Sequence, residues 1–155
     1  MEVFLPCLYA FFSCAAFSVF FNLNRKWMPL TCLGGALGWF IYLVIGLQSD
    51  VYGYFAATVV IAVYSEVMAR VCRVPVTLFL TVGILPLVPG GGMYYTMKYC
   101  VSGDAQMFME TGIHTLALAG AIAIGIVLVT SLVRMWKVMQ TPKMFYKEKI
   151  RQEDY

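Results

Sequence analysis

The chain has 155 residues, of which 61% are hydrophobic and 12% are charged. In soluble domains about a quarter of all residues are charged. This composition therefore excludes an ordinary soluble domain and predicts an integral membrane protein. The formal net charge is only +3, and the basic residues gather at the ends of apolar runs, which does not fit a nucleic-acid-binding surface. The expected surrounding is therefore the lipid bilayer, and no nucleic-acid partner is expected.

Five apolar runs are predicted to cross the bilayer, because a spanning helix needs about 20 apolar residues. The first run lacks the basic start of a cleaved signal peptide, so it is expected to be kept as a span. The sequence thus predicts an all-α polytopic membrane protein, with a five-span transmembrane domain over residues 1–137 and a cytoplasmic basic tail over residues 138–155. The predicted spans are residues 3–21, 30–47, 51–71, 76–101 and 112–136.

The fourth span is interrupted by segment 86–92, which holds two prolines and three consecutive glycines. Proline removes a backbone donor and glycine weakens a helix, so a continuous helix is not expected there. Unpaired peptide groups are costly in hydrocarbon, and a break is tolerated where protein, water or solute satisfies them. This predicts the wall of a polar cavity, formed either by a broken crossing helix or by a re-entrant hairpin between Pro86 and Tyr95.

The helix after the break is expected to restart near Gly92 or Met93. Its first N–H groups would be unpaired and its positive end would point into the gap, where it could bind a carboxylate or phosphate. A kink that only accommodates helix packing is the alternative. The candidate solute-binding residues are Pro89, Gly90, Gly91, Gly92, Tyr94 and Tyr95.

Three residues are candidates for proton coupling. Glu66 lies inside an apolar run, about 10 Å from the cytoplasmic end of the third span, and ionisable groups at such depth are functional candidates by default. In the functional interpretation Glu66 exchanges the coupling proton and Arg70 modulates this exchange. The structural alternative is an ion pair of Glu66 with Arg70, or with Arg134 of the fifth span. His114, near the outer end of the fifth span, can change charge near neutral pH, although a polar cap is its simpler role.

No catalytic residues, metal site or cofactor are expected. The five cysteines form no C-x-x-C pair and the chain has one histidine, so the cysteines are expected to act as small buried hydrophobic residues. An intramembrane enzyme would need a nucleophile with a base, or a metal cluster, at membrane depth, and the sequence supplies neither. Gly34 and Gly38 have the spacing that lets another helix approach closely, which indicates packing.

Charge placement predicts the orientation. Of the 11 lysines and arginines, Lys98 alone falls on one side of the predicted spans, and basic residues favour the cytoplasmic side. The amino terminus is therefore expected outside and the carboxyl terminus in the cytoplasm. Residues 102–110 are expected to form a polar loop on the outer side.

Three stretches of this sequence are similar to a known family. They are Ser65-Glu66-Val67-Met68-Ala69-Arg70, Pro75, and the run Leu85-Pro86-Leu87-Val88-Pro89-Gly90-Gly91-Gly92-Met93-Tyr94-Tyr95-Thr96-Met97. Over essentially its whole length the chain resembles the threonine/serine exporter family, in the form of the short five-span subunit that corresponds to the carboxyl-terminal half of the fused exporters.

The resemblance implies an exporter of small carboxylates driven by the proton-motive force. Threonine and serine are the solutes of some members, and dicarboxylates such as succinate those of a related two-subunit type. It also implies a larger partner subunit, encoded separately, in the cell inner membrane. This agrees with the odd number of spans, since paired repeats would require another chain or a second copy in a homo-oligomer.

The sequence as a whole favours one subunit of a secondary transporter. No nucleotide-binding motif of the form G-x-x-x-x-G-K-[ST] is present, so the energy is expected to come from an ion gradient. An accessory or scaffolding subunit that stabilises a larger transporter is the alternative.

Overall fold

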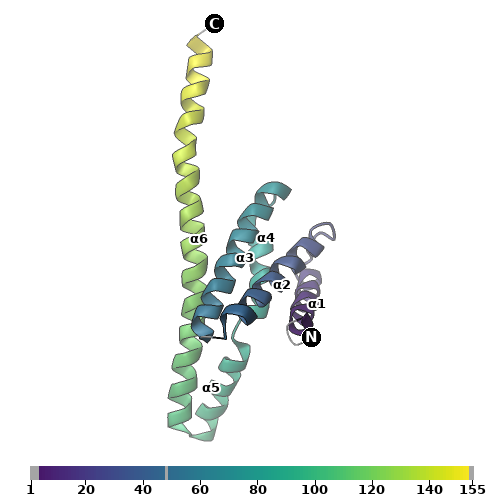
Figure 1. Ribbon diagram of the computed structural model, residues 1–155, viewed down its shortest axis with the longest axis vertical. Coiled ribbons are helices and arrows are strands. Elements are labelled where there is room, and N and C mark those ends of the chain that lie inside the picture. Colours follow the sequence, from purple (N-terminus) through teal and green to yellow (C-terminus); the bar gives the residue numbers. More distant parts are fainter. Residues whose placement is uncertain (1–3, 48, 154–155) are drawn as a thin grey trace.

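The structure is a computed structural model that describes residues 4–47 and 49–153, with side chains described up to residue 139. It is all-α over these residues, as the sequence predicts (Figure 1). The helices are α1 (Phe4–Phe20), α2 (Met28–Ile45), α3 (Asp50–Cys72), α4 (Val76–Ile84), α5 (Gly90–Ser102) and α6 (Ala105–Glu153), with a 3₁₀ turn, η1 (Leu85–Leu87), after α4.

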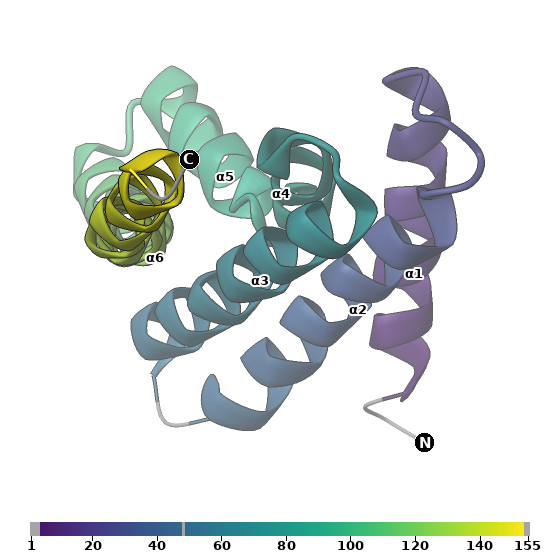
Figure 2. The ribbon, with the colours of Figure 1, turned by 90° about the horizontal axis from the view of Figure 1, so that it is seen from above.

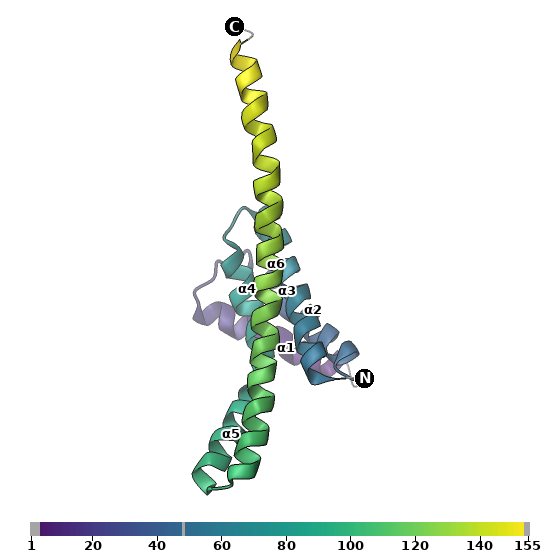
Figure 3. The same cartoon turned by 90° about the vertical axis from the view of Figure 1, so that its left-hand side faces the viewer.

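Helices α1 to α4 form a bundle, and α6 runs along one side of it (Figure 1). In Figure 2, which looks along α6, helix α1 is seen side-on at the far side of the bundle, so it lies across the direction of α6. Figure 3 shows the same crossing from another side. Helix α5 packs against the start of α6, and this α5–α6 hairpin extends past the α2–α3 connection (Figure 1).

The bundle is held tightly by glycines on α2. A Cβ built on Gly34 would lie 2.8 Å from the ring of Tyr64, and one on Gly38 would meet the side chain of Ile61. The hydroxyl of Tyr64 also donates to the carbonyl of Leu30 on α2 at 2.7 Å. Because these helices touch where side chains are absent, the packing role predicted for Gly34 and Gly38 is confirmed.

Three described helices are long and apolar enough to span a membrane: α2, α3 and residues 105–139 of α6. A fourth span is present if α4 with η1 and α5 are counted as one broken crossing. Helix α1 is apolar but has 17 residues, fewer than the roughly 20 that a crossing along the normal needs. The protein is thus a helical membrane protein with three or four such spans, and the fifth span remains a prediction.

The break in the fourth span is confirmed, but its details differ from the prediction. The axes before and after it differ in direction by 51°. Helix α5 begins at Gly90 rather than near Gly92 or Met93. The first turn of a helix needs no donor bonds within the helix, so the three glycines can form it directly after Pro89.

The predicted polar loop over residues 102–110 is wrong. Gly103, in the left-handed conformation with φ 77°, ends α5, and Asp104 caps α6 by accepting a hydrogen bond from the Met107 N–H at 3.1 Å. These two signals confine the link to two residues. Glu110 therefore lies on α6, in its second turn.

The predicted fifth span is part of a longer helix. Helix α6 has 49 residues, about 73 Å at the usual rise, and its backbone continues through most of the predicted tail. The side chains of residues 140–155, and hence all basic residues of the predicted tail, lie outside the described residues.

Candidate functional site

The contact between α5 and α6 is built from glycine and threonine. A Cβ on Gly92 would meet the Thr115 side chain, so the two backbones approach closely here. Thr96 donates to the carbonyl of Gly92 at 2.8 Å and its hydroxyl oxygen lies 3.4 Å from that of Thr111. Thr115 donates to the carbonyl of Thr111 at 2.7 Å. The threonine hydroxyls thus find acceptors inside the hairpin and leave small side chains at the contact.

A cavity of about 440 Å³ opens between the two helices, and we call it the α5–α6 groove. Tyr95 and Tyr99, four residues apart, stand on the α5 side, and Glu110 and His114, also four apart, stand on the α6 side, because residues at this spacing share a helix face. Its lining residues are Gly92, Tyr95, Tyr99, Glu110, Thr111, His114 and Thr115.

One end of the groove lies at the first turn of α5. The N–H of Gly90 donates to the carbonyl of Val88 at 2.7 Å, whereas those of Gly91 and Gly92 donate to no acceptor within residues 4–47 and 49–153. A Cβ on Gly90 or Gly91 would meet nothing within 4 Å, so this end is open. Free N–H groups at a helix start favour an anion.

The charged groups of the groove are carboxylate and imidazole. His114 Nε2 lies 3.7 Å from Asp50 Oδ2 at the start of α3, and Asp50 also accepts a hydrogen bond from the Tyr42 hydroxyl at 3.4 Å. Within the described side chains Glu110 has no ion pair or hydrogen bond. No lysine or arginine lines the groove, so its fixed charge is negative while His114 is neutral.

The structure brings together some of the predicted solute-binding residues and separates others. Gly92, Tyr95 and His114 meet in the groove, and Gly90 and Gly91 lie exposed beside it. Pro89, by contrast, is buried in the packing, and Tyr94 is 65% exposed and points outside the groove. The predicted segment is therefore only partly gathered into one site.

Sequence reasoning missed four lining residues: Tyr99, Glu110, Thr111 and Thr115. Glu110 was assigned to a loop, and the pairing of α5 with α6 cannot be read from either helix alone. A signal was nevertheless present, because Thr111 and Thr115 repeat at four residues on α6, as Gly92 and Thr96 do on α5, and such stripes of small residues indicate close helix contacts.

Glu66 and Arg70 lie elsewhere. Arg70 is the ion-pair partner of Glu66, at 3.8 Å, and its guanidinium lies 5.8 Å from the ring of Trp136 on α6. Glu66 is 8% exposed, and its Oε2 atom is buried without a hydrogen bond. Trp136 follows His114 by 22 residues, so this pair lies about 33 Å along α6 from the groove.

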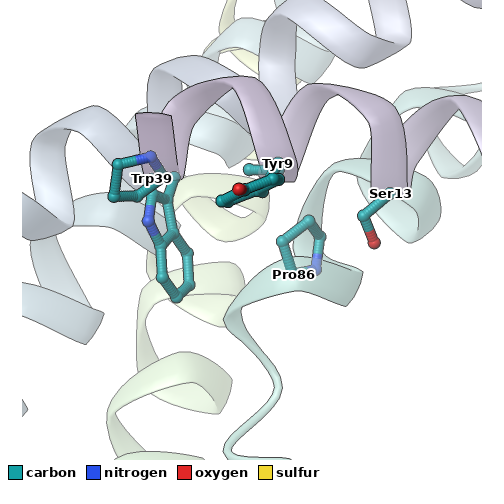
Figure 4. Close-up of a pocket in the computed structure, with 6 residues that line it drawn as sticks. Tyr9, Ser13, Trp39 and Pro86 are labelled. Atoms are coloured by element: carbon teal, nitrogen blue, oxygen red, sulfur yellow. The ribbon is translucent and has the colours of Figure 1, made fainter. Parts of the chain in front are cut away.

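A second cavity of about 260 Å³ lies between α1, α2 and η1 (Figure 4). Tyr9, Ser13, Trp39 and Pro86 surround it in Figure 4, together with Pro6 and Ala10. The indole Nε1 of Trp39 is buried without a hydrogen-bond partner. No charged side chain lines this cavity, so it offers less for a polar solute than the groove.

Among the described residues no cluster of three or more potential metal ligands occurs. Of the cysteines, Cys14 and Cys32 are buried as predicted, Cys7 and Cys72 are half-buried, and Cys100 is exposed. The cysteines therefore match the predicted packing role in part.

An all-helical membrane fold with a broken helix beside a polar groove is an arrangement found in transporters, because irregular backbone at membrane depth occurs where it lines a cavity. A sequence model of the family described as Threonine/Serine exporter, ThrE, matches residues 6–132. The chain therefore belongs to the threonine/serine exporter family, and it is a membrane protein of the amino acid export type. No curated protein and no solved structure matches it.

Proposed function

We propose that this chain is one subunit of a secondary transporter that exports a small amino acid, threonine or serine, and that the α5–α6 groove holds the solute. The observation that carries the proposal is the meeting of Gly92, Tyr95 and His114 in one cavity, at the helix start where the N–H groups of Gly91 and Gly92 are free. These groups are the donors that a carboxylate would use.

The export step is proposed to be driven by the proton-motive force. His114 is the proton-coupling candidate that lies in the groove, where a change in its charge would act directly on a bound carboxylate. Glu66 and Arg70 are too remote to contact the same solute. They would contribute through the packing of α3 on α6, near the cytoplasmic end in the proposed orientation, with the amino terminus outside and the carboxyl terminus in the cytoplasm.

A larger, separately encoded subunit is the proposed partner. Helix α5 buries none of its residues within the chain, and its outer face exposes large apolar side chains. In a bilayer such a surface faces lipid or packs against further helices. The residues of this face are Met93, Tyr94, Met97 and Val101, all at least half exposed.

The same exposed face also favours the second candidate function, an accessory subunit that stabilises a larger transporter. In that case α5 is an assembly surface and the solute lies in the partner. The two functions differ in what the groove residues do, so they are separated by changing side chains that line the groove and leaving the outer face intact.

Tyr94 and Tyr95 offer this comparison. Cells without their own exporters would be loaded with radiolabelled threonine, serine or succinate, and efflux measured with the chain alone and with the larger subunit, with and without a protonophore. Tyr95→Phe should lower amino acid efflux about threefold to tenfold, because a hydrogen bond contributes about 0.5–1.5 kcal/mol. Tyr94→Phe, which changes the neighbouring ring outside the groove, should leave efflux unchanged.

Protonophore-sensitive efflux that Tyr95→Phe weakens would support the exporter. The accessory role would instead be supported if efflux required the chain but was the same in wild type, Tyr94→Phe and Tyr95→Phe. This comparison is made at equal amounts of assembled protein. Efflux of succinate in place of amino acids would assign the chain to the dicarboxylate type.

A further inference from the structure

The α5–α6 groove has two chemically different ends. At one end, Gly92 faces Thr115, next to the free N–H groups of the first turn of α5. At the other, Tyr99 and Glu110 form the wall. Glu110 precedes Thr115 by five residues, or about 7.5 Å along α6, which is the scale of a small amino acid with its hydrogen bonds at both ends.

Glu110 is exposed at the wall of the groove, and it has no partner among the described side chains. None of the described cations forms an ion pair with it, and Lys98 stands instead over the ring of Tyr95, 6.0 Å from its centre. Carboxylates in such positions accept charge-assisted hydrogen bonds from ammonium groups. The remaining lining residues are glycine, hydroxyl-bearing side chains and His114, none of which is permanently cationic.

We propose that Glu110 binds the α-ammonium group of a zwitterionic amino acid, whose carboxylate lies at the Gly92 end of the groove. The inference rests on the proposed function and deepens it, because it assigns each charged group of the solute to one end of the groove. Glu110 thereby becomes a specificity-determining residue that separates amino acids from dicarboxylates.

The reason for this specificity is electrostatic. A zwitterion presents opposite charges to the two ends, whereas succinate would place its second carboxylate beside Glu110. Like charges a few ångströms apart repel each other even in a solvated groove. A 2-hydroxy acid such as glycerate, in which a hydroxyl replaces the ammonium group of serine, avoids the repulsion but loses the attraction.

The test measures binding to the full chain in lipid nanodiscs, since every lining residue of the groove belongs to this chain. Labelled L-serine, glycerate and succinate would be titrated against wild type, Glu110→Gln, Glu110→Asp and Met109→Gln. Met109 neighbours Glu110 on α6 but does not line the groove, so Met109→Gln controls for a change on the same turn. Glu110→Asp keeps the charge with a shorter reach.

Glu110→Gln should weaken serine binding about tenfold or more, because a hydrogen bond to a charged group is lost, while glycerate binding stays the same or tightens. Glu110→Asp should retain the preference for serine over glycerate, and Met109→Gln should match wild type. Serine binding by Glu110→Gln within twofold of wild type would overturn the inference.

The inference and the proposed function fail in different ways. One possible result is that amino acid efflux remains proton-driven and sensitive to Tyr95→Phe, while Glu110→Gln does not change the preference for serine. This result overturns the role of Glu110 alone. Wild-type chain that binds succinate better than serine overturns both.

Discussion

The imidazole of His114 lies 3.7 Å from the carboxylate of Asp50, and this contact ties the beginning of α3 to α6 at the edge of the groove. The Tyr42 hydroxyl on α2 binds the same carboxylate at 3.4 Å, so three helices meet at Asp50. A change in the charge of His114 would therefore act both on a solute in the groove and on the packing of the hairpin against the bundle.

The Asp50–His114 contact should contribute little to stability. Both side chains are about half exposed, and exposed pairs of this kind contribute about 0–1 kcal/mol. A double-mutant cycle of Asp50→Asn and His114→Gln, measured by thermal unfolding, should give a coupling energy of about 0–1 kcal/mol. A coupling energy above about 2 kcal/mol would show that the two side chains are held together more strongly than their exposure predicts.

The glycines of the break should differ sharply in their tolerance of a side chain. Gly92→Ala places a methyl group against Thr115, so α5 or the threonine must move, at a cost of about 1–3 kcal/mol for overpacking. Gly90→Ala and Gly91→Ala meet open space and should be neutral or slightly stabilising, because alanine restricts the unfolded chain.

The measurement is hydrogen exchange of the α5–α6 hairpin. Gly92→Ala should accelerate exchange in α5, and Thr115→Ala in the same chain should restore much of the protection because it removes the clashing atoms. Equal exchange in Gly91→Ala and Gly92→Ala would contradict the close approach of the two helices.

The class of fold was predictable from composition, and the break from its prolines and glycines, because these depend on local chemistry. The site was only partly predictable. Gly92 and Tyr95 were found through the break, but Glu110 was assigned to a loop, since Gly103 and Asp104 end one helix and start the next within two residues. The groove exists only because α5 packs on α6, and the partner of a helix is a tertiary property that the two stripes of small residues indicate but do not specify.

Glu66 was correctly predicted to be buried. The sequence already placed Glu66 near the cytoplasmic end of the third span and His114 near the outer end of the fifth, as two separate candidates for proton coupling. The parallel packing of α3 on α6, from the Asp50–His114 contact to the Arg70–Trp136 contact, places them at opposite ends of the helix pair. Coupling between them would require a movement of the helices and not a direct proton transfer.

Glu66 and Arg70 should be unequal in their effects on stability. Arg70→Gln leaves the buried carboxylate of Glu66 without its countercharge, whereas Glu66→Gln removes the buried charge itself and leaves Arg70, whose side chain is 43% exposed, in contact with water. Losing one partner of a buried pair is the more costly change. Arg70→Gln should therefore lower the free energy of unfolding by about 1–3 kcal/mol, and Glu66→Gln by less. Thermal unfolding at pH 7 measures both, and a larger loss in Glu66→Gln would indicate that the carboxylate has a favourable partner beyond Arg70.

The close packing of α2 on α3 gives the last prediction. A Cβ on Gly38 would meet the end of the Ile61 side chain, which is 1% exposed, and would lie 3.3 Å from Cδ1 of Leu87 in the turn before the break. Gly38→Ala should thus destabilise the bundle by about 1–3 kcal/mol and also displace η1, so the position of the hairpin would change with it. Combining it with Ile61→Val, which removes the nearer of the two contacting side-chain carbons, should recover part of the lost stability. Gly120→Ala on α6 is the matched control, since a Cβ there meets nothing within 4 Å. If Gly120→Ala and Gly38→Ala lowered the stability equally in thermal unfolding, the packing of α2 on α3 would not depend on Gly38. Other contacts between the bundle and η1 would then have to position the break.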